Sequence, residues 1–466
     1  MNLWDLTAAE MAARVRDKSV SPVDLVQACL ERSEAVQPKL NCFCFTFPDE
    51  ALEAARAAEV AVMRGETLGA LHGVPIAIKD FTPTKGKTTT RGSAAFRNWV
   101  PDRDAVIVER LANAGAILLG KTTTPEFAFS SFTRSPLWGH TRNPWNASRN
   151  AGGSSGGSGV AVATGCVALA EGSDMGGSVR IPAAFCGIVG LKPSLGRIPM
   201  DILFTSFDSI SHFGPLARTV EDAKLFLEVT QGPHDADIQS QVAPIPLPRQ
   251  LTGDMTGRRI ALSRDLGFIE VAPDVTENLM ATARHLEARG AVIEEVALDW
   301  SVDVVRAWYA YWGVFLAAGF GDCLERYRDE MDPAVVKLIE RGMKMDAVAF
   351  KRLEAVRTRQ WQALAPILAR CDALVCPTMT RGAPETESEE TEHVDAQGRL
   401  HGLDMTSPFN NVSQCPVLSV PSGFTGDGLP TAVQIVGRRF DDPTVLEIGK
   451  AVEACCPAAL PSALPL

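Results

Sequence analysis

Short apolar runs that fit β-strands alternate with helical segments, and this alternation limits the fold more than any other feature of the sequence. The run GVPIAIKD (73–80) precedes a helical segment (105–114), which is followed by AILLG (116–120). Another strand, helix and strand follow one another within 258–298. Such alternation builds α/β folds. The sequence therefore predicts a mixed, mostly parallel central sheet covered by helices on both faces.

Nothing in the sequence divides the chain into independent units. Its 466 residues are 46% hydrophobic and 22% charged, which is close to the usual composition of globular proteins. No internal repeat and no second core are visible. We expect one large domain in four parts: N-terminal helices (1–65), a glycine-rich part with strands (66–235), a mostly helical part (240–370), and strands with a closing helix (371–466).

Charge and composition exclude several classes of protein. The net charge is −11, from 45 basic and 56 acidic residues, and an acidic chain without a basic run does not bind nucleic acid by itself. No apolar run reaches the ~18 residues of a membrane helix, and no signal peptide is visible. The eleven cysteines are scattered without a CxxC pair. We therefore expect free thiols, no metal site and a cytoplasmic location.

Two glycine-rich turns flank an apolar run that favours a helix. GGSSGGSG (152–159) directly precedes this run, which a flexible linker would not usually do. GSDMGGS (172–178) can present successive backbone N–H groups to one point, as an oxyanion hole requires. Lys79 ends an apolar strand, where burial would lower the pKa of its ammonium and suit a Ser–Ser–Lys proton relay. From composition alone, an exposed Lys79 paired with Asp80 is the commoner arrangement.

Two further motifs suggest other chemistries. Residues 115–122, GAILLGKT, match a phosphate-binding loop, but that loop needs a strand before its first glycine, whereas here we expect a helix there and a strand within the motif. GGSSG (152–156) fits the nucleophile elbow of a Ser-His-Asp hydrolase, for which His393 and His401 are late histidines. That elbow needs a preceding strand, and the sequence shows none ending at 151.

Residues 151–194, AGGSSGGSGVAVATGCVALAEGSDMGGSVRIPAAFCGIVGLKPS, closely resemble the amidase signature family. Segments that share the resemblance are 73–80, GKTTTPEFA (120–128), TRNPWNASR (141–149) and GLPTAVQIVGRRFDDPTVL (428–446). The resemblance implies that residues 1–466 form one amidase signature domain. Its catalytic core would be the second of the four parts, and the divergent third part would shape the substrate site.

The resemblance also implies a catalytic triad. Ser178 would be the nucleophile, Lys79 the general base, and Ser154, preceded by a cis peptide bond, the bridge between them. It further implies supporting groups: backbone N–H donors of an oxyanion hole at Met175, Gly176, Gly177 and Ser178, a pair formed by Asp174 and Arg180, a supporting Ser155, and a pocket near Ala128, Ser130 and Ser131.

The expected function is hydrolysis of a small linear carboxamide to a carboxylate and ammonia or an amine, without cofactor or metal. The partner is a small-molecule amide; we expect no membrane and leave room for a homodimer. The alternative is the glutaminase component of a tRNA-dependent amidotransferase. That protein would need an arginine and an aspartate to clamp glutamine, with Arg306, Arg357 and Arg359 as candidates by region.

An aromatic cluster lies in the divergent part, in a chain with only three tyrosines. Its members could line a pocket for an aryl or apolar acyl group. Ordinary helix packing or a subunit interface is the more common use of such residues. The cluster comprises Trp308, Tyr309, Tyr311 and Trp312.

Overall fold

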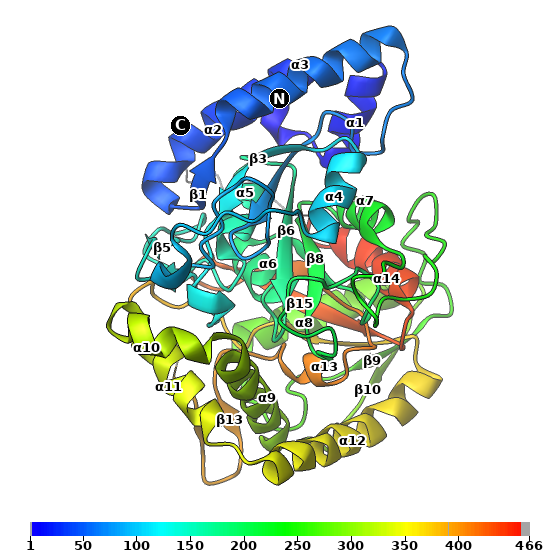
Figure 1. The fold of residues 1–466 in the computed structure, drawn as a ribbon. Helices are drawn as coiled ribbons and strands as arrows, with labels where there is room; N and C mark the ends of the chain where they lie inside the picture. The colour runs from blue at the N-terminus through cyan, green and yellow to red at the C-terminus, as the bar shows by residue number, and fades with distance from the viewer. Residues whose placement is uncertain (1, 390, 458–466) are drawn as a thin grey trace.

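The computed structural model describes residues 2–389 and 391–457. Within these residues, eleven strands form one sheet that runs through the centre of the molecule (Figure 1). Five of its strands are buried at every position. In spatial order they are β1 (Phe43–Thr46), β3 (Ile117–Thr122), β2 (Pro75–Lys79), β6 (Leu169–Asp174), β8 (His212–Ala217), β7 (Val189–Lys192), β14 (Val417–Phe424), β15 (Pro430–Gly437), β11 (Ala373–Pro377), β9 (Arg259–Leu262) and β10 (Val292–Glu295).

The sheet is mixed, as the sequence predicts. Parallel pairing joins β3, β2 and β6 on one side, and β11, β9 and β10 on the other. The strands between these two blocks pair antiparallel. Antiparallel pairing thus takes a larger share of the sheet than expected, because β14 and β15 form a hairpin and β8 lies between β6 and β7.

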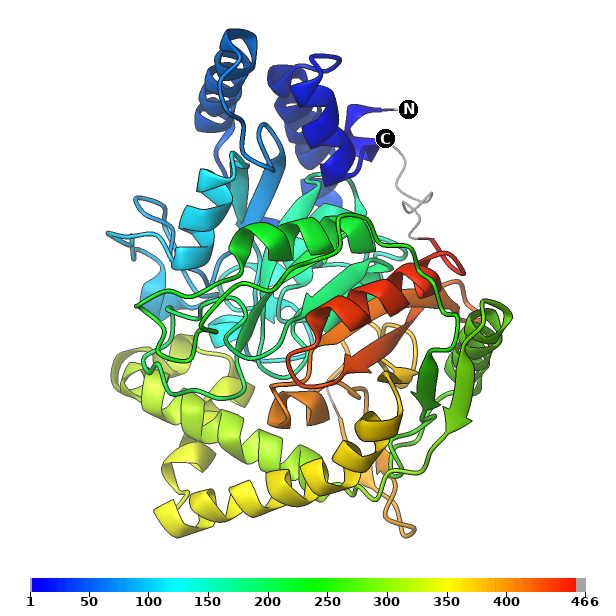
Figure 2. The same ribbon diagram turned by 90° about the vertical axis from the view of Figure 1, so that its right-hand side faces the viewer.

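Helices cover both faces of the sheet. α5 (Gly156–Ala163) and α6 (Arg180–Cys186) pack together on one face against β6, β7 and β15. The other face carries α7 and α14, which cross in front of the strands in Figure 2, with α4 and α8 beside them. The bounds are α4 (Val106–Asn113), α7 (Val220–Thr230), α8 (Pro273–Ala288) and α14 (Asp442–Glu453).

Two helical groups lie at opposite ends of the molecule (Figures 1 and 2). The first is formed by the N-terminal helices, and the second by helices of the divergent part, where α9 packs against α11 and α12. No helix of the described residues is long and apolar enough to cross a membrane. The bounds are α1 (Ala8–Arg16), α2 (Pro22–Leu40), α3 (Pro48–Arg64), α9 (Asp303–Phe320), α10 (Leu324–Tyr327), α11 (Pro333–Met343), α12 (Ala347–Arg370) and α13 (Pro408–Asn411).

Candidate active site

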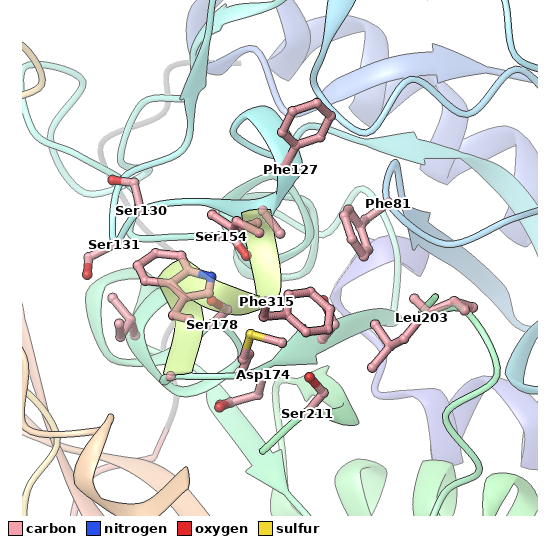
Figure 3. A pocket seen from close by; sticks show the side chains of 18 of the residues that line it. Phe81, Phe127, Ser130, Ser131, Ser154, Asp174, Ser178, Leu203, Ser211 and Phe315 are labelled. Carbon is pink, nitrogen blue, oxygen red and sulfur yellow. The ribbon is translucent and has the colours of Figure 1, made fainter. Parts of the chain in front are cut away.

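A cavity lies beyond the ends of β2 and β6, under helix α9. Figure 3 shows the side chains of Ser154, Ser178, Phe81 and Phe315 around this space. β2 and β6 are neighbouring parallel strands, so their carboxyl ends meet at the same edge of the sheet. That edge is where open α/β sheets bind their ligands.

Lys79, the last residue of β2, is fully buried and points its ammonium at two serines. Its Nζ donates a hydrogen bond to Ser154 Oγ at 2.7 Å and another to Ser173 Oγ at 3.1 Å. The expected cis peptide bond between Gly153 and Ser154 is present. The alternative expectation of an exposed Lys79 paired with Asp80 is wrong, because both side chains are buried and the Asp80 carboxylate accepts hydrogen bonds from Thr90.

Burial lowers the pKa of Lys79 from its ordinary value to about 7, although the charges of Glu171 and Asp174 act in the opposite direction. Desolvation disfavours the ammonium more than these two carboxylates stabilise it. Lys79 therefore loses its proton as the pH rises through about 7, and a neutral amine can accept a proton. Ser173 contributes its hydroxyl to Lys79, a contact that the sequence reasoning missed.

Ser178 lies on the turn between β6 and α6 and lines the cavity together with Ser154. Its side chain is only partly covered, whereas Ser154 is fully buried. Ser155 holds the two glycine-rich turns together: its backbone N–H donates to Ser178 O at 3.2 Å, and its hydroxyl lies 3.4 Å from Ser173 O. The structure therefore brings Lys79, Ser154 and Ser178 to one site.

The expected pair of Asp174 and Arg180 stabilises the turn between β6 and α6. Both side chains are fully buried and form two hydrogen bonds of 3.0 Å. Burial alone would raise the pKa of Asp174, but the Arg180 charge and its hydrogen bonds outweigh this effect and hold the pKa well below its ordinary value. Arg180 also donates to Thr406 O, Gln434 Oε1 and Asn410 Oδ1.

The backbone of this turn requires one correction to the expected oxyanion hole. The N–H of Gly177, at φ +127°, donates to Asp174 Oδ1 at 2.8 Å, and Gly177 does not line the cavity. Because this N–H already donates to Asp174, it stabilises the turn and is not available to an oxyanion. The other three expected donors, at Met175, Gly176 and Ser178, belong to residues that do line the cavity.

Two side chains from distant parts of the chain hold carbonyls of the turn. Trp308 Nε1 donates to Met175 O at 2.8 Å, and Thr406 Oγ1 donates to Gly176 O at 2.6 Å. Because C=O and N–H point in opposite directions across a planar peptide, holding the Met175 carbonyl also fixes the direction of the Gly176 N–H. No pattern in the sequence pointed to Thr406.

The aromatic cluster divides between the cavity and ordinary packing. Trp308 and Trp312 line the cavity, together with Phe315 and Leu316 of the same helix. Tyr309 and Tyr311 do not belong to the lining, which corrects the expectation for these two residues: positions 308, 312, 315 and 316 share one face of α9. Tyr311 instead packs against Phe350 at 5.0 Å between ring centroids.

The remaining wall combines an expected segment with residues that sequence reasoning missed. Ala128, Ser130 and Ser131 line the cavity as expected. Ala128 and Ser130 adopt positive φ values of 58° and 111°. Two of the missed residues are polar, Ser173 and Ser211. The others are apolar and come from widely separated segments, so nothing distinguished them from core residues: Phe81, Phe127, Ile181, Met200, Ile202, Leu203, Phe315 and Leu316.

The two alternative motifs adopt other roles. Helix α4 precedes Gly115, and β3 runs through Lys121, whose side chain is fully buried. A phosphate could not reach Lys121, so residues 115–122 are not a phosphate-binding loop. Ser154 is hydrogen-bonded by Lys79 rather than by a histidine, and no histidine is among the described residues that line the cavity.

Comparisons with known proteins agree with this geometry. The family model described as Amidase matches residues 24–446. An acylamidase of Rhodococcus erythropolis is 36% identical over 98% of this chain and 97% of its own. A glutamyl-tRNA(Gln) amidotransferase component from Sulfurihydrogenibium sp. (strain YO3AOP1) is 32% identical over 96% of both chains.

The fold is likewise shared over its full length. The crystal structure of a bacterial aryl acylamidase of the amidase signature enzymes superposes with a TM-score of 0.93 at 30% identity, covering 99% of both chains. The chain belongs to the amidase signature family and hydrolyses amide C–N bonds.

Proposed function

We propose that the protein hydrolyses small linear amides with an uncharged, apolar acyl group, through an acyl-enzyme on Ser178. The observation that carries this proposal is the chemistry of the cavity. Rings of Phe81, Trp312 and Phe315 line the cavity together with the serines, and the one charged residue of the described lining, Asp174, is already paired with Arg180. Such a wall favours apolar groups and disfavours a substrate charge that would be buried without a partner.

Acylation begins with neutral Lys79. Ser178 Oγ attacks the amide carbon, and its proton passes through Ser154 to Lys79 Nζ, along the 2.7 Å hydrogen bond between these two groups. The oxyanion receives N–H groups from among Met175, Gly176 and Ser178, and one such donor is typically worth about 3–4 kcal/mol. The proton then returns through Ser154 to the leaving nitrogen as the C–N bond breaks.

Deacylation repeats these steps with water. Water attacks the ester carbon of acylated Ser178 and gives its proton, through the same relay, to Lys79. The carboxylic acid leaves as Ser178 regains the proton. One amide and one water thus yield one carboxylic acid and one amine or ammonia, and Lys79, Ser154 and Ser178 return to their first state.

The glutaminase alternative receives less support from the cavity. Arg306 pairs with Asp303 on the surface, Arg359 is exposed, and Arg357 donates to Asn411 O and to Ser209 Oγ. None of these three arginines lines the cavity. The zwitterionic end of glutamine would therefore enter an apolar space without a free cation among the described lining residues.

A substrate panel tests the proposal. Anilides and aliphatic carboxamides of apolar acids would be compared with glutamine by release of the acid, and the acyl-enzyme would be trapped and located by peptide mass spectrometry. We expect kcat/KM for the apolar amides to exceed that for glutamine by about 100-fold or more, with the acyl group on Ser178. Preference for glutamine, or a label on Ser154, would contradict the proposal.

A further inference from the structure

A second buried carboxylate, that of Glu171, contacts the backbone of the relay lysine. Glu171, in the middle of β6, is fully buried. Its Oε2 accepts the backbone N–H of Lys79 at 2.9 Å, and its Oε1 accepts the hydroxyl of Thr82 at 3.0 Å. A carboxylate buried this deeply needs nearby positive charge to stay ionised.

Lys121 supplies that charge from the strand on the far side of β2. It is fully buried on β3, and its Nζ donates to Thr84 Oγ1 at 2.9 Å and to Thr82 O. Thr82 therefore connects the two charged groups: its hydroxyl donates to Glu171, and its carbonyl accepts from Lys121. This lysine also belongs to the segment that resembles a phosphate-binding loop.

The charges around Glu171 come from three strands. β2 ends at Lys79 and is followed by Asp80, β3 contributes Lys121, and β6 itself continues to Asp174. The opposite neighbour, β8, places Pro215 beside Glu171. Helix α5 adds only the Ser158 hydroxyl, which donates to the Glu171 carbonyl. The two lysines are thus the positive charges that act on Glu171, and Asp174 is committed to Arg180.

We propose that Glu171 is the buried counter-charge of Lys79, a positioning residue whose carboxylate stabilises the ammonium formed when Lys79 receives the Ser178 proton. Lys121, through Thr82, keeps this carboxylate ionised. The inference rests on the proposed role of Lys79 as the general base.

The counter-charge balances two opposing requirements on the pKa of Lys79. Burial makes Lys79 neutral at rest, but burial alone would also make it too weak a base to hold the proton during the reaction. The charge of Glu171 raises the pKa of Lys79 against desolvation, and the balance lies at about 7. Burial in turn raises the pKa of Glu171, and the charges of Lys79 and Lys121 oppose that rise.

Glu171→Gln tests the proposal, because glutamine has nearly the same shape and its amide oxygen can still accept the Lys79 N–H. We expect the acid limb of the kcat profile to move about one pH unit toward acid, because an ammonium without its counter-charge loses its proton more readily. On the plateau, kcat should fall about 3- to 10-fold as the base weakens, with KM unchanged. An acid limb that stays in place would overturn the proposal.

Asp222→Asn is the matched control. Asp222 is also a fully buried carboxylate that accepts backbone N–H groups, those of Ala8 and Ala9, but it lies on α7 away from the cavity. Its loss should lower the melting temperature without moving the acid limb. An equal shift in this variant would mean that the shift reports general destabilisation, which would also overturn the proposal.

Thr82→Val provides a second route if the glutamine variant does not fold. It removes the hydroxyl that stabilises the Glu171 carboxylate, so the acid limb should move in the same direction by a smaller amount, and no movement would overturn the proposal. Lys79→Ala separates the two proposals. If Lys79→Ala keeps wild-type kcat, the base assignment itself is wrong; if it is inactive while Glu171→Gln leaves the limb in place, only the counter-charge is wrong.

Discussion

The floor and the wall of the cavity are built on different principles. The floor, formed by the ends of β2 and β6 and the two glycine-rich turns, consists of buried polar groups in defined hydrogen bonds, such as Lys79 to Ser154. The wall, formed by α9 and the segments around Phe81 and Leu203, consists of apolar side chains in ring and methyl contacts. The difference indicates that the floor determines the reaction and the wall determines which amide is accepted.

Removing the nucleophile should abolish the reaction that the floor carries out. Ser178→Ala deletes one hydroxyl and leaves the wall unchanged, so kcat should fall by at least about 1,000-fold, as losses of catalytic nucleophiles do elsewhere. Steady-state kinetics on an apolar anilide, with the melting temperature as a folding control, checks this prediction. A variant that keeps more than about a hundredth of wild-type kcat would contradict the assignment of Ser178.

Replacing Lys79 by arginine should show whether this residue acts through its positive charge or through its ability to accept a proton. Lys79→Arg keeps a cation but cannot accept a proton, so kcat should fall about 100-fold or more. In the wild type, the pKa of Lys79 near 7 means that activity falls as pH drops below about 7 and stays high above it. pH–rate profiles of the wild type and of the arginine variant test the acid limb and the loss of kcat. Near-wild-type kcat in the arginine variant would refute the base role.

A wall substitution should affect recognition more than chemistry. Phe315→Ala removes a ring from the cavity, so KM for an apolar amide should rise about 10-fold, with kcat within about threefold. Tyr311→Phe, on the same helix but outside the lining, should leave both constants unchanged. A large fall in kcat with constant KM for Phe315→Ala would contradict the division between floor and wall.

The smallest expected effect lies where floor and wall meet. Trp308→Phe keeps a ring in the wall but removes the hydrogen bond to Met175 O, so kcat should fall about 5-fold, the value of one hydrogen bond. Trp300→Phe is the control, because Trp300 is also a buried tryptophan that donates to a backbone carbonyl, that of Gln360. Equal losses of kcat in both variants would show that Trp308 acts only through stability.

The floor could be predicted in outline because its residues lie in recognisable local motifs. Both serines lie on glycine-rich turns and Lys79 ends an apolar strand, which makes a relay conceivable. Its assignment to Lys79, Ser154 and Ser178 came from the resemblance to the amidase signature family, because Lys79 and Ser154 are 75 positions apart and composition alone favours an exposed lysine. Two floor residues carried weaker signals: Ser173 lies within a recognised turn, but Thr406 reaches Gly176 from 230 positions away. The alternation of strands and helices predicts the parallel pairs, while the antiparallel position of β8 between β6 and β7 depends on a strand order that no local pattern encodes.

The wall could not be predicted in the same way. Its apolar residues come from separate segments, and an apolar side chain that faces a cavity has the same sequence signature as one that faces the core. Helix α9 is the exception. The spacing of Trp308, Trp312 and Phe315 matches one helical face. Tyr311, three positions after Trp308, falls at the edge of the same face, so the period alone does not separate it from the lining residues.

The hydrogen bond from Trp308 to Met175 has a consequence for how such an enzyme can change over evolution. Exchange of Trp312 or Phe315 removes no hydrogen bond to the catalytic turn, so it should admit new acyl groups with little effect on kcat. Exchange of Trp308 lowers kcat, because the side chain that contributes to the wall also orients the backbone of that turn. New specificities should therefore arise along one face of α9 around a constant tryptophan, and a designed library would vary 312 and 315 while keeping 308.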